Sequence, residues 1–215
     1  MAESGEDSTE QVQSEVFYTS DLPEPASQTR KLRDASVLIP LLKQKDEWHV
    51  LYIRRSKNLH DRHSGQVAFP GGASEDGDLD AIDTALRETR EEIGISRDNI
   101  TIVGSLPNYE TVSYFSVTPV VGLLNWPCTM NLEPSEVARA FTIPLTWLLD
   151  DSNYTLRDRQ AQPASSSGPE TKRRLQVVHF DEYDGEVLWG ATARMTLNLL
   201  LALRKGTLLI PGWKP

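Results

Sequence analysis

Three glutamates and an arginine stand close together in the stretch Arg87–Ile95, which reads RETREEIGI. In a helix, Glu88, Glu91 and Glu92 would lie three and four residues apart, so their side chains would share one face and repel one another. Such a cluster costs stability unless a cation neutralises it. Carboxylates at this spacing can hold a hard divalent cation such as Mg²⁺ or Mn²⁺, which keeps coordination positions for water or phosphate oxygens.

A cation held in this way would activate a bound water and neutralise the charge that develops on phosphates during their hydrolysis. Arg87 stands at the edge of the cluster, where its guanidinium can pair with a carboxylate and fix its rotamer. The alternative is an ordinary solvated helix face, because short acidic motifs are weak evidence. Two features favour the metal site: the glutamates lie opposite an apolar stripe, and a tight FPGG loop precedes the helix.

The helix itself is predicted from Asp78 to Glu92, where the apolar residues take helical spacing. Its apolar face carries Ile82, Leu86, Thr89 and Ile93, and Gly94 predicts its end. Before the helix, the runs ASVLIPLL and WHVLYIRR predict two strands, and residues 67–69 predict a short one. These elements would position the FPGG loop against the start of the helix.

The rest of the chain predicts more strands than helices. ITIVGSL and FSVTPVVGLL are typical of strands, while PSEVARAFTIPLTWLL predicts a short helix or turn followed by a buried segment. LQVVHFDEYDGEVLWG predicts a hairpin that turns at Asp184-Gly185. ATARMTLNLLLALRKG predicts a closing helix that ends at Gly206. Together these segments indicate one α/β domain without internal repeats.

The length of 215 residues fits one domain with appendages, or at most two small ones. Residues 1–30 are polar and acidic and predict a flexible arm, residues 31–215 predict the folded domain, and residues 160–173 predict a surface loop within it. The net charge of −9 argues against general nucleic-acid or membrane-surface binding. It does not exclude a nucleotide substrate, because a bound metal reverses the local charge of its site.

Cys128 is the single cysteine, so disulfides, zinc ribbons and Cys-Cys redox pairs are excluded within the monomer. The apolar run LNLLLAL is too short to span a membrane. The acidic N-terminus resembles neither a secretory signal nor an arginine-rich transit peptide. We therefore expect a cytoplasmic protein, with a processed mitochondrial form as the alternative that the sequence leaves open.

The stretch from Gly72 to Ile95 resembles the Nudix box, G-x5-E-x7-R-E-U-x-E-E-x-G-U with U aliphatic. The matching residues are Gly72, Arg87, Glu88, Glu91, Glu92, Gly94 and Ile95. There are three departures: Asp78 stands where glutamate is usual, the gap from it to Arg87 is one residue longer, and Thr89 takes an aliphatic position. The resemblance implies a Nudix fold, an α/β/α sandwich with a mixed β-sheet, and a metal-dependent diphosphatase.

The segment RRSKNLHDRHSGQVAFPGG resembles the one before the box in the coenzyme A diphosphatase branch of the family, which also tends to carry the longer box and TALRE. The arginine of that segment is displaced here to Arg62, and the segment is one residue longer than the commonest form. Downstream, PSEVARAFTIPLTWLL and LWGATAR resemble further family segments, so the resemblance covers about residues 35–205. It implies hydrolysis of coenzyme A or acyl-CoA to 3′,5′-ADP and a phosphopantetheine product. ADP-ribose, dinucleotides and modified nucleoside triphosphates are alternative substrates, and a non-catalytic nucleotide-sensing module or a dimerising scaffold are weaker alternatives.

The box implies Mg²⁺ or Mn²⁺ as cofactor, held by Glu88, Glu91 and Glu92. The expected catalytic residues are Arg87, Glu88, Glu91 and Glu136. Glu136 would be a further ligand or the general base, although a glutamate at a helix N-terminus is equally consistent with a favourable dipole interaction. The expected partner is a small nucleotide substrate resembling coenzyme A, without nucleic acid or membrane, and a homodimer is left open.

The expected substrate-binding residues are Arg55, Arg62, His63, Gln66, Gly71 and Gly72. Arg54 is a further candidate for phosphate binding, and one of Arg54 and Arg55 is expected to point to solvent, because neighbouring residues on a strand point to opposite faces. Trp189 is expected in the core together with the LLLAL helix. The aromatic residues of NYETVSYFS could stack a base or hold a pantetheine arm, and ordinary packing is the simpler reading.

Overall fold

The computed structural model describes residues 16–22, 31–57, 64–159 and 175–213 of the chain. Its main sheet is mixed and contains β1 (Arg33–Gln44), β2 (Glu47–Arg55), β3 (Val67–Ala68), β4 (Gly71–Ala73), β5 (Ile100–Ser105), β6 (Tyr109–Glu110), β7 (Phe115–Leu124) and β8 (Val137–Pro144). A second sheet contains β9 (Tyr154–Arg159), β10 (Leu175–Tyr183) and β11 (Glu186–Trp189). The helices are α2 (Ala81–Ile93), α3 (Leu145–Leu148) and α4 (Gly190–Arg204), with two 3-10 turns at Arg97–Asn99 and Asp151–Asn153.

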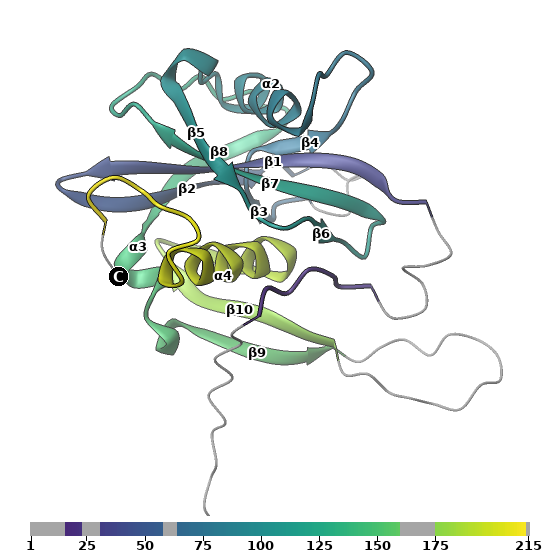
Figure 1. The fold of residues 1–215 in the computed structure, drawn as a ribbon, viewed down its shortest axis with the longest axis vertical. Coiled ribbons are helices and arrows are strands. Elements are labelled where there is room, and N and C mark those ends of the chain that lie inside the picture. The colour runs from purple at the N-terminus through teal and green to yellow at the C-terminus, as the bar shows by residue number, and fades with distance from the viewer. Residues whose placement is uncertain (1–15, 23–30, 58–63, 160–174, 214–215) are drawn as a thin grey trace, which may run out of the picture.

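The elements form layers, with α2 on one face of the main sheet and α4 on the other (Figure 1). The sheet order is β3-β2-β1-β7-β5, in which β1 pairs parallel to β7 and antiparallel to β2. The central strand β1 is apolar on both faces, as expected for a strand covered on both sides. Leu38 packs in the cluster beneath α2, and Ile39 packs in the cluster beneath α4. This α/β/α arrangement with a mixed sheet confirms the predicted fold.

Helix α4 lies between the main sheet and β10, so it is buried on nearly all sides (Figure 1). Leu199, Leu200 and Leu203 each expose 2% or less of their surface. The buried Thr196 hydroxyl lies 3.1 Å from the Tyr52 hydroxyl of β2, which satisfies both polar groups. This enclosure explains why LNLLLAL is apolar except at Asn198. Within the described ranges, no helix is long and apolar enough to cross a membrane.

The N-terminal segment was predicted to be a flexible arm over residues 1–30, and the structure describes residues 16–22 of it. These residues pack against the domain. The Asn198 side chain, 3% exposed on α4, donates to the Tyr18 carbonyl at 2.8 Å and accepts from the Tyr18 amide at 3.1 Å. The stretch continues to Ser20, which bridges to Glu110 of β6. The predicted loop over residues 160–173 lies outside the described residues.

Candidate active site

Helix α2 carries the acidic cluster, and its ends are set by local side-chain and backbone chemistry. Asp80 caps the start by accepting from the Asp83 amide at 2.8 Å, so the helix begins at Ala81, three residues after the predicted start. Gly94 ends the helix in the left-handed region at φ 72°, as predicted. A Cβ at this glycine would also meet Asn131 at 2.8 Å, so a side chain would be excluded by space as well. The caps fix the two ends of the helix, while the packing of Ala85 against Leu38 and Val120 of the sheet fixes its rotation.

The three glutamates of α2 differ sharply in burial. Glu92 is 1% exposed, the Glu88 side chain is 16% exposed, and the Glu91 side chain is 49% exposed. The cluster therefore runs from the core to the surface and is not a uniform solvated face. A buried carboxylate persists only where partners or a cation compensate its charge.

Arg87 is held by several carboxylates at once. Its guanidinium makes a two-pronged contact with Asp78, with Nε to Oδ1 at 2.9 Å and Nη2 to Oδ2 at 3.0 Å. Its Nη1 donates to Glu88 at 2.9 Å and to Glu91 at 3.1 Å. Asp78 also accepts from the Thr84 hydroxyl at 2.9 Å. The aspartate at this unusual position thus anchors the arginine that orients Glu88, and this contact lowers the pKa of Asp78 well below its usual range.

Gly71 and Gly72 let the backbone approach the carboxylates closely. The Gly71 amide donates to Glu92 at 2.9 Å, and a Cβ on Gly71 would lie 2.4 Å from the Ser36 carbonyl oxygen. A Cβ on Gly72 would lie 2.6 Å from the carboxyl carbon of Glu88. The two glycines of FPGG are therefore required by space, since neither position has room for a side chain without displacing backbone or a carboxylate.

A cleft of about 350 Å³ lies over these groups. It is lined by Arg55, Ser56, Gly71, Gly72, Glu88, Glu92, Ser135 and Glu136. Arg55 reaches to within 3.8 Å of Glu92. The Ser56 amide donates to the Glu136 carbonyl at 2.8 Å, which holds the Glu136 turn beside the end of β2. Residues from β2, β4, α2 and the turn before β8 thus meet at one place.

Burial and mutual repulsion raise the pKa values of two carboxyl groups in the cleft, Glu88 and Glu92. Burial, opposed by the Gly71 amide and Arg55 and reinforced by Glu88 and Glu136, raises the pKa of Glu92 to about 8. Burial also raises the pKa of Glu88, with the Arg87 contact acting in the opposite direction. A cation in the cleft would favour the charged forms of both groups.

The donors of the cleft fit a hard divalent cation. Glu88, Glu92 and Glu136 supply carboxylate oxygens, and Ser56 and Ser135 supply hydroxyl oxygens, which are hard ligands of the kind that Mg²⁺ and Mn²⁺ prefer. Arg87 contacts one oxygen of Glu88, and the Gly71 amide contacts one oxygen of Glu92, so both carboxylates are oriented by neighbours. Within the described ranges, however, no three His, Cys, Asp or Glu side chains are already drawn together as a metal site. These side chains would therefore have to move closer together to coordinate one metal ion.

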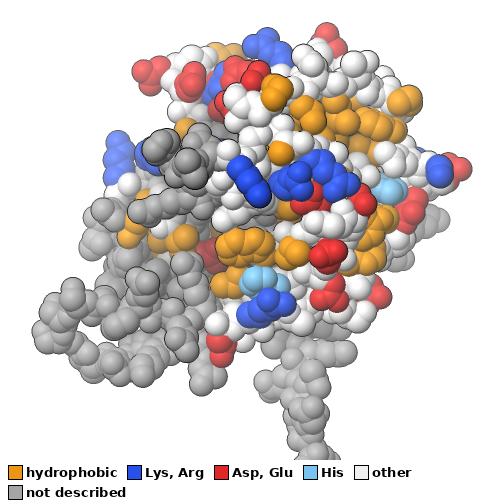
Figure 2. All heavy atoms as spheres, turned by 180° about the vertical axis from the view of Figure 1, so that it is seen from behind, with side chains coloured by type: hydrophobic (Ala, Val, Ile, Leu, Met, Phe, Trp, Pro, Cys, Tyr) orange, Lys and Arg blue, Asp and Glu red, His pale blue; other side chains and the backbone are white. Residues whose placement is uncertain are grey.

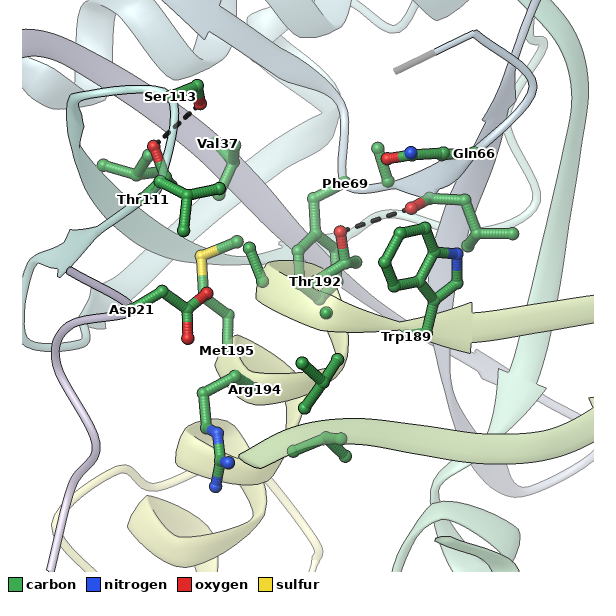
Figure 3. Close-up of a pocket in the computed structure, with 18 of the residues that line it drawn as sticks. Asp21, Val37, Gln66, Phe69, Thr111, Ser113, Trp189, Thr192, Arg194 and Met195 are labelled. Atoms are coloured by element: carbon green, nitrogen blue, oxygen red, sulfur yellow. Dashed lines mark hydrogen bonds between the residues drawn. The ribbon is translucent and has the colours of Figure 1, made fainter. Parts of the chain in front are cut away.

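A larger pocket of about 910 Å³ shares Arg55, Gly71 and Gly72 with the cleft. Figure 3 shows Gln66 and Trp189 at one end of this pocket and Thr111, Ser113 and Val37 at the other. Between them, the Thr192 hydroxyl on the first turn of α4 donates to the Val67 carbonyl at 3.2 Å. The pocket is enclosed by segments from the N-terminus, both sheets and α4, and many of its lining side chains are apolar.

The structure brings together six of the expected site residues: Arg55, Gly71, Gly72, Glu88, Glu92 and Glu136. Glu91 lies outside the cleft lining and pairs with Arg87, while Gln66 lines the larger pocket. Arg62 and His63 lie outside the described residues. Arg54 points away from the cleft and pairs with buried Glu186 at 3.0 Å, as the alternation of the strand predicts.

Trp189 was expected in the core, and this prediction is wrong. Its side chain is 41% exposed, it stacks on His179, and it lines the large pocket. The signal that could have placed it is the alternation of β11, in which Glu186 and Leu188 are buried while Val187 and Trp189 are exposed. Strand β9, whose residues complete this wall, was not predicted at all. Of the aromatic loop, Tyr109 is fully buried and Phe115 lines the pocket.

The match to a family model supports the identity of the box. The NUDIX domain model matches residues 32–165. A relative from Pectobacterium atrosepticum called "Uncharacterized Nudix hydrolase NudL" is 35% identical over 186 residues, which cover 86% of this chain and 91% of the relative. A relative of the same name from Escherichia coli K12 is 33% identical over 181 residues, which cover 84% of this chain and 88% of the relative.

Solved structures resemble the chain more distantly. A MutT/nudix family protein from Enterococcus faecalis has a TM-score of 0.48 at 18% identity, covering 86% of this chain and 64% of that one. A C. elegans Ap4A hydrolase complex has a TM-score of 0.46 at 23% identity, covering 56% of this chain and 83% of that one. The family assignment rests on the domain model and the full-length relatives, together with the carboxylate helix and its glycine loop. The chain belongs to the Nudix family of hydrolases.

Proposed function

We propose that this Nudix hydrolase cleaves the diphosphate of coenzyme A or an acyl-CoA, giving 3′,5′-ADP and (acyl-)4′-phosphopantetheine. The observation that carries the proposal is the continuity between the carboxylate cleft and the large pocket. If the diphosphate of the substrate lay at Gly71 and Gly72, the pocket would have room for both ends of a long substrate. Its volume of about 910 Å³ suits a ligand of this size.

Nudix hydrolases generally use divalent metals, and the expected ions here are Mg²⁺ or Mn²⁺. When bound, such an ion supplies charge neutralisation on the diphosphate and a more acidic water. Glu88 and Glu92 would hold it, with Glu91 as the third ligand of the box. Arg87 keeps Glu88 in place through the contact at 2.9 Å.

The remaining polar groups of the cleft would act on the substrate and the attacking water. The Arg55 guanidinium lines the cleft and can bind a phosphate oxygen with two donors. Glu136 is an exposed carboxylate at the cleft edge, so it can accept the proton of the attacking water. Water then bonds to phosphorus while the bridging oxygen leaves with its phosphoryl group.

A substrate panel tests this proposal. Coenzyme A, acetyl-CoA, ADP-ribose, NADH and ATP are each incubated with Mg²⁺ or Mn²⁺, and the products are separated and quantified. We expect the highest kcat/KM for coenzyme A or acetyl-CoA, with 3′,5′-ADP as the nucleotide product. A higher kcat/KM for ADP-ribose, NADH or ATP would overturn the substrate assignment and leave the hydrolase family intact.

A homodimer is a further part of the proposal. Large apolar side chains are exposed at Leu79 and Leu209, which are 89% and 77% accessible in the single chain. Sedimentation equilibrium at several protein concentrations measures the mass in solution. A mass that stays at that of one chain would remove the dimer from the proposal without touching the activity.

A further inference from the structure

Trp189 combines an exposed aromatic ring with a rigid support. The ring is 41% exposed and stacks on the His179 ring, with centroids 5.7 Å apart and planes inclined by 10°. A large aromatic surface left open to a pocket costs free energy unless a ligand covers it. Burial and the nearby charge of Arg157 both lower the pKa of His179, which favours the neutral form of the supporting ring. Trp189 and His179 thus form a stacked pair at the pocket wall.

The register of the small sheet explains why these groups meet. His179 pairs with Trp189 across β10 and β11, and residues paired directly across an antiparallel ladder point to the same face. Val177 lies two residues before His179 on that face and pairs with Arg157 of β9. The opposite face carries Val178, which is 1% exposed in the core. The aromatic stack and the Arg157 guanidinium therefore lie on one face of the second sheet.

An ion-pair network holds this hairpin to the main sheet. Glu186, only 5% exposed, accepts at 3.0 Å from Arg54 of β2 and at 3.0 Å from Arg139 of β8. Arg139 also pairs with Asp184 in the hairpin turn. A buried carboxylate shared by two arginines is costly to break, so the hairpin is fixed relative to the cleft. On the surface in Figure 2, basic and acidic side chains lie close to hydrophobic side chains and a histidine.

The ring of Trp189 lies at one end of the pocket, with the side-chain amide of Gln66 opposite it in Figure 3. Arg157, whose charge acts on His179, also lines the pocket. The other end carries Val37 and the hydroxyl side chains of Thr111 and Ser113 (Figure 3). A flat heteroaromatic base needs a stacking surface and polar edge partners, whereas an aliphatic arm needs neither. The chemistry of the Trp189 end therefore favours a nucleobase.

We propose that the Trp189–His179 stack binds the nucleobase of the substrate, and that Arg157 binds a phosphate on the ribose of the same nucleoside. This inference rests on the proposed function, because a 3′-phosphate distinguishes coenzyme A from ADP-ribose and NADH. The stack serves any adenine nucleotide, while Arg157 selects those with the additional phosphate. The residues act in substrate recognition and take no part in the bond-breaking step.

Direct nucleotide binding tests the inference without relying on turnover. ADP and 3′,5′-ADP are titrated calorimetrically into the wild-type protein, Trp189→Ala, Trp189→Phe, Arg157→Gln and the control Val187→Ala. Val187 lies on the same strand and face as Trp189, is 42% exposed, and is absent from the pocket lining. We expect Trp189→Ala to weaken both nucleotides by about tenfold or more, as loss of a base stack does. Trp189→Phe should recover most of the affinity.

The Arg157→Gln variant separates the two parts of the inference. It should lower the affinity for 3′,5′-ADP by about tenfold and leave the affinity for ADP within twofold of the wild-type value, because only 3′,5′-ADP carries the additional phosphate. Equal weakening of both nucleotides would overturn the role of Arg157. Unchanged ADP binding by Trp189→Ala, or wild-type protein that binds neither nucleotide, would overturn the stacking platform.

A parallel titration with 4′-phosphopantetheine identifies the occupant of the platform. If Trp189→Ala weakened this ligand and spared ADP, the platform would hold the pantetheine arm and the inference would be wrong. Turnover of coenzyme A by the wild-type protein is measured separately. Absent turnover together with the expected ADP results would refute the proposed substrate while leaving the platform in place.

Discussion

The carboxylate cleft and the larger pocket share Arg55, Gly71 and Gly72, yet one concentrates negative charge and the other exposes apolar and aromatic surface. In the cleft, the cost lies in Glu92, a buried carboxylate whose pKa is raised to about 8. In the pocket, the cost lies in rings such as Trp189, which is 41% exposed. Both costs fall when a ligand binds, a cation in the first region and a substrate in the second. Each region is therefore less stable without its ligand than with it. Functional sites commonly carry such a cost in stability.

The largest effect should come from removing charge in the cleft. Glu92→Gln keeps the size of the side chain and an oxygen that accepts from the Gly71 amide, but it removes the negative charge. We expect kcat to fall by about 10²-fold to 10³-fold, the range seen when one major electrostatic contact to a transition state is lost. Steady-state hydrolysis measures the change.

Asp83→Asn is the matched control for this variant, because Asp83 lies on the same helix and pairs with Arg97 on the surface. Its kcat should stay within about twofold of the wild-type value, since exposed ion pairs contribute little. Equal losses in the two variants would show that general helix charge matters and that the cleft has no special role.

A smaller effect is expected from filling the space between the two regions. Gly72→Ala would place a Cβ 2.6 Å from the carboxyl carbon of Glu88, so the carboxylate must move. We expect kcat to fall by about 10-fold to 100-fold, because misplacing a catalytic group by about 1 Å costs about this much. Gly77→Ala is the control, since a Cβ there meets nothing within 4 Å. Full activity in Gly72→Ala would mean that the observed position of Glu88 is not required.

The Arg87 contact should have a more moderate effect. Asp78→Asn removes the charge that holds the guanidinium at 2.9 Å and 3.0 Å, while Glu88 and Glu91 can still bind it. We expect kcat to fall about tenfold and the free energy of unfolding to drop by about 1 to 3 kcal/mol, the usual cost of losing a charged hydrogen-bond partner. Activity and urea denaturation measure the two effects. If neither kcat nor the free energy of unfolding fell, Asp78 would not be needed to hold Arg87.

The smallest effect is an increase in stability. A carboxyl group with a raised pKa binds its proton more tightly in the folded state, so its contribution to stability is present at low pH and is lost as the pH rises. For Glu92 the loss runs from about pH 4.5 to about pH 8. With chelator present, Glu92→Gln should therefore be more stable than wild type at pH 8 by on the order of 2 kcal/mol. Urea denaturation at pH 5 and pH 8 checks this, and a gap that does not widen with pH would contradict it.

The two regions also differ in how well the sequence predicts them. One wall of the cleft, formed by Gly71, Gly72 and the helix that follows, lies in one continuous segment, so residue spacing alone indicates it. The three glutamates could be found in this way, but their gradient of burial could not, because it depends on how the helix packs on the sheet through residues such as Ala85 and Ile93. The role of Asp78 in holding Arg87 was also not predictable from the sequence, because it depends on how the loop before the helix folds.

The large pocket could not be predicted, because its walls come from distant segments. Arg157, His179 and Trp189 meet only through the register of a sheet in which β9 was not recognised. The residue types around Trp189 fit a buried strand as well as a half-exposed one. The alternation of buried and exposed residues in β11 covers only four positions, so it is a weak signal. The long strands β1, β2, β5 and β7 and helix α4 were predicted because apolar runs determine them, and the β10–β11 hairpin was predicted from its Asp184-Gly185 turn. Strand β8 was expected as a short helix or turn followed by a buried segment, and β9 was missed, because both depend on long-range pairing.

Metal binding tests the central claim most directly. Mg²⁺ and Mn²⁺ are titrated calorimetrically, without substrate, into wild-type protein, Glu92→Gln and the control Asp83→Asn. We predict saturable binding to wild type and Asp83→Asn with the same affinity, and affinity at least about tenfold lower for Glu92→Gln, because the ion loses a charged ligand. Equal affinities in all three proteins would contradict the assignment of the cleft as the metal site.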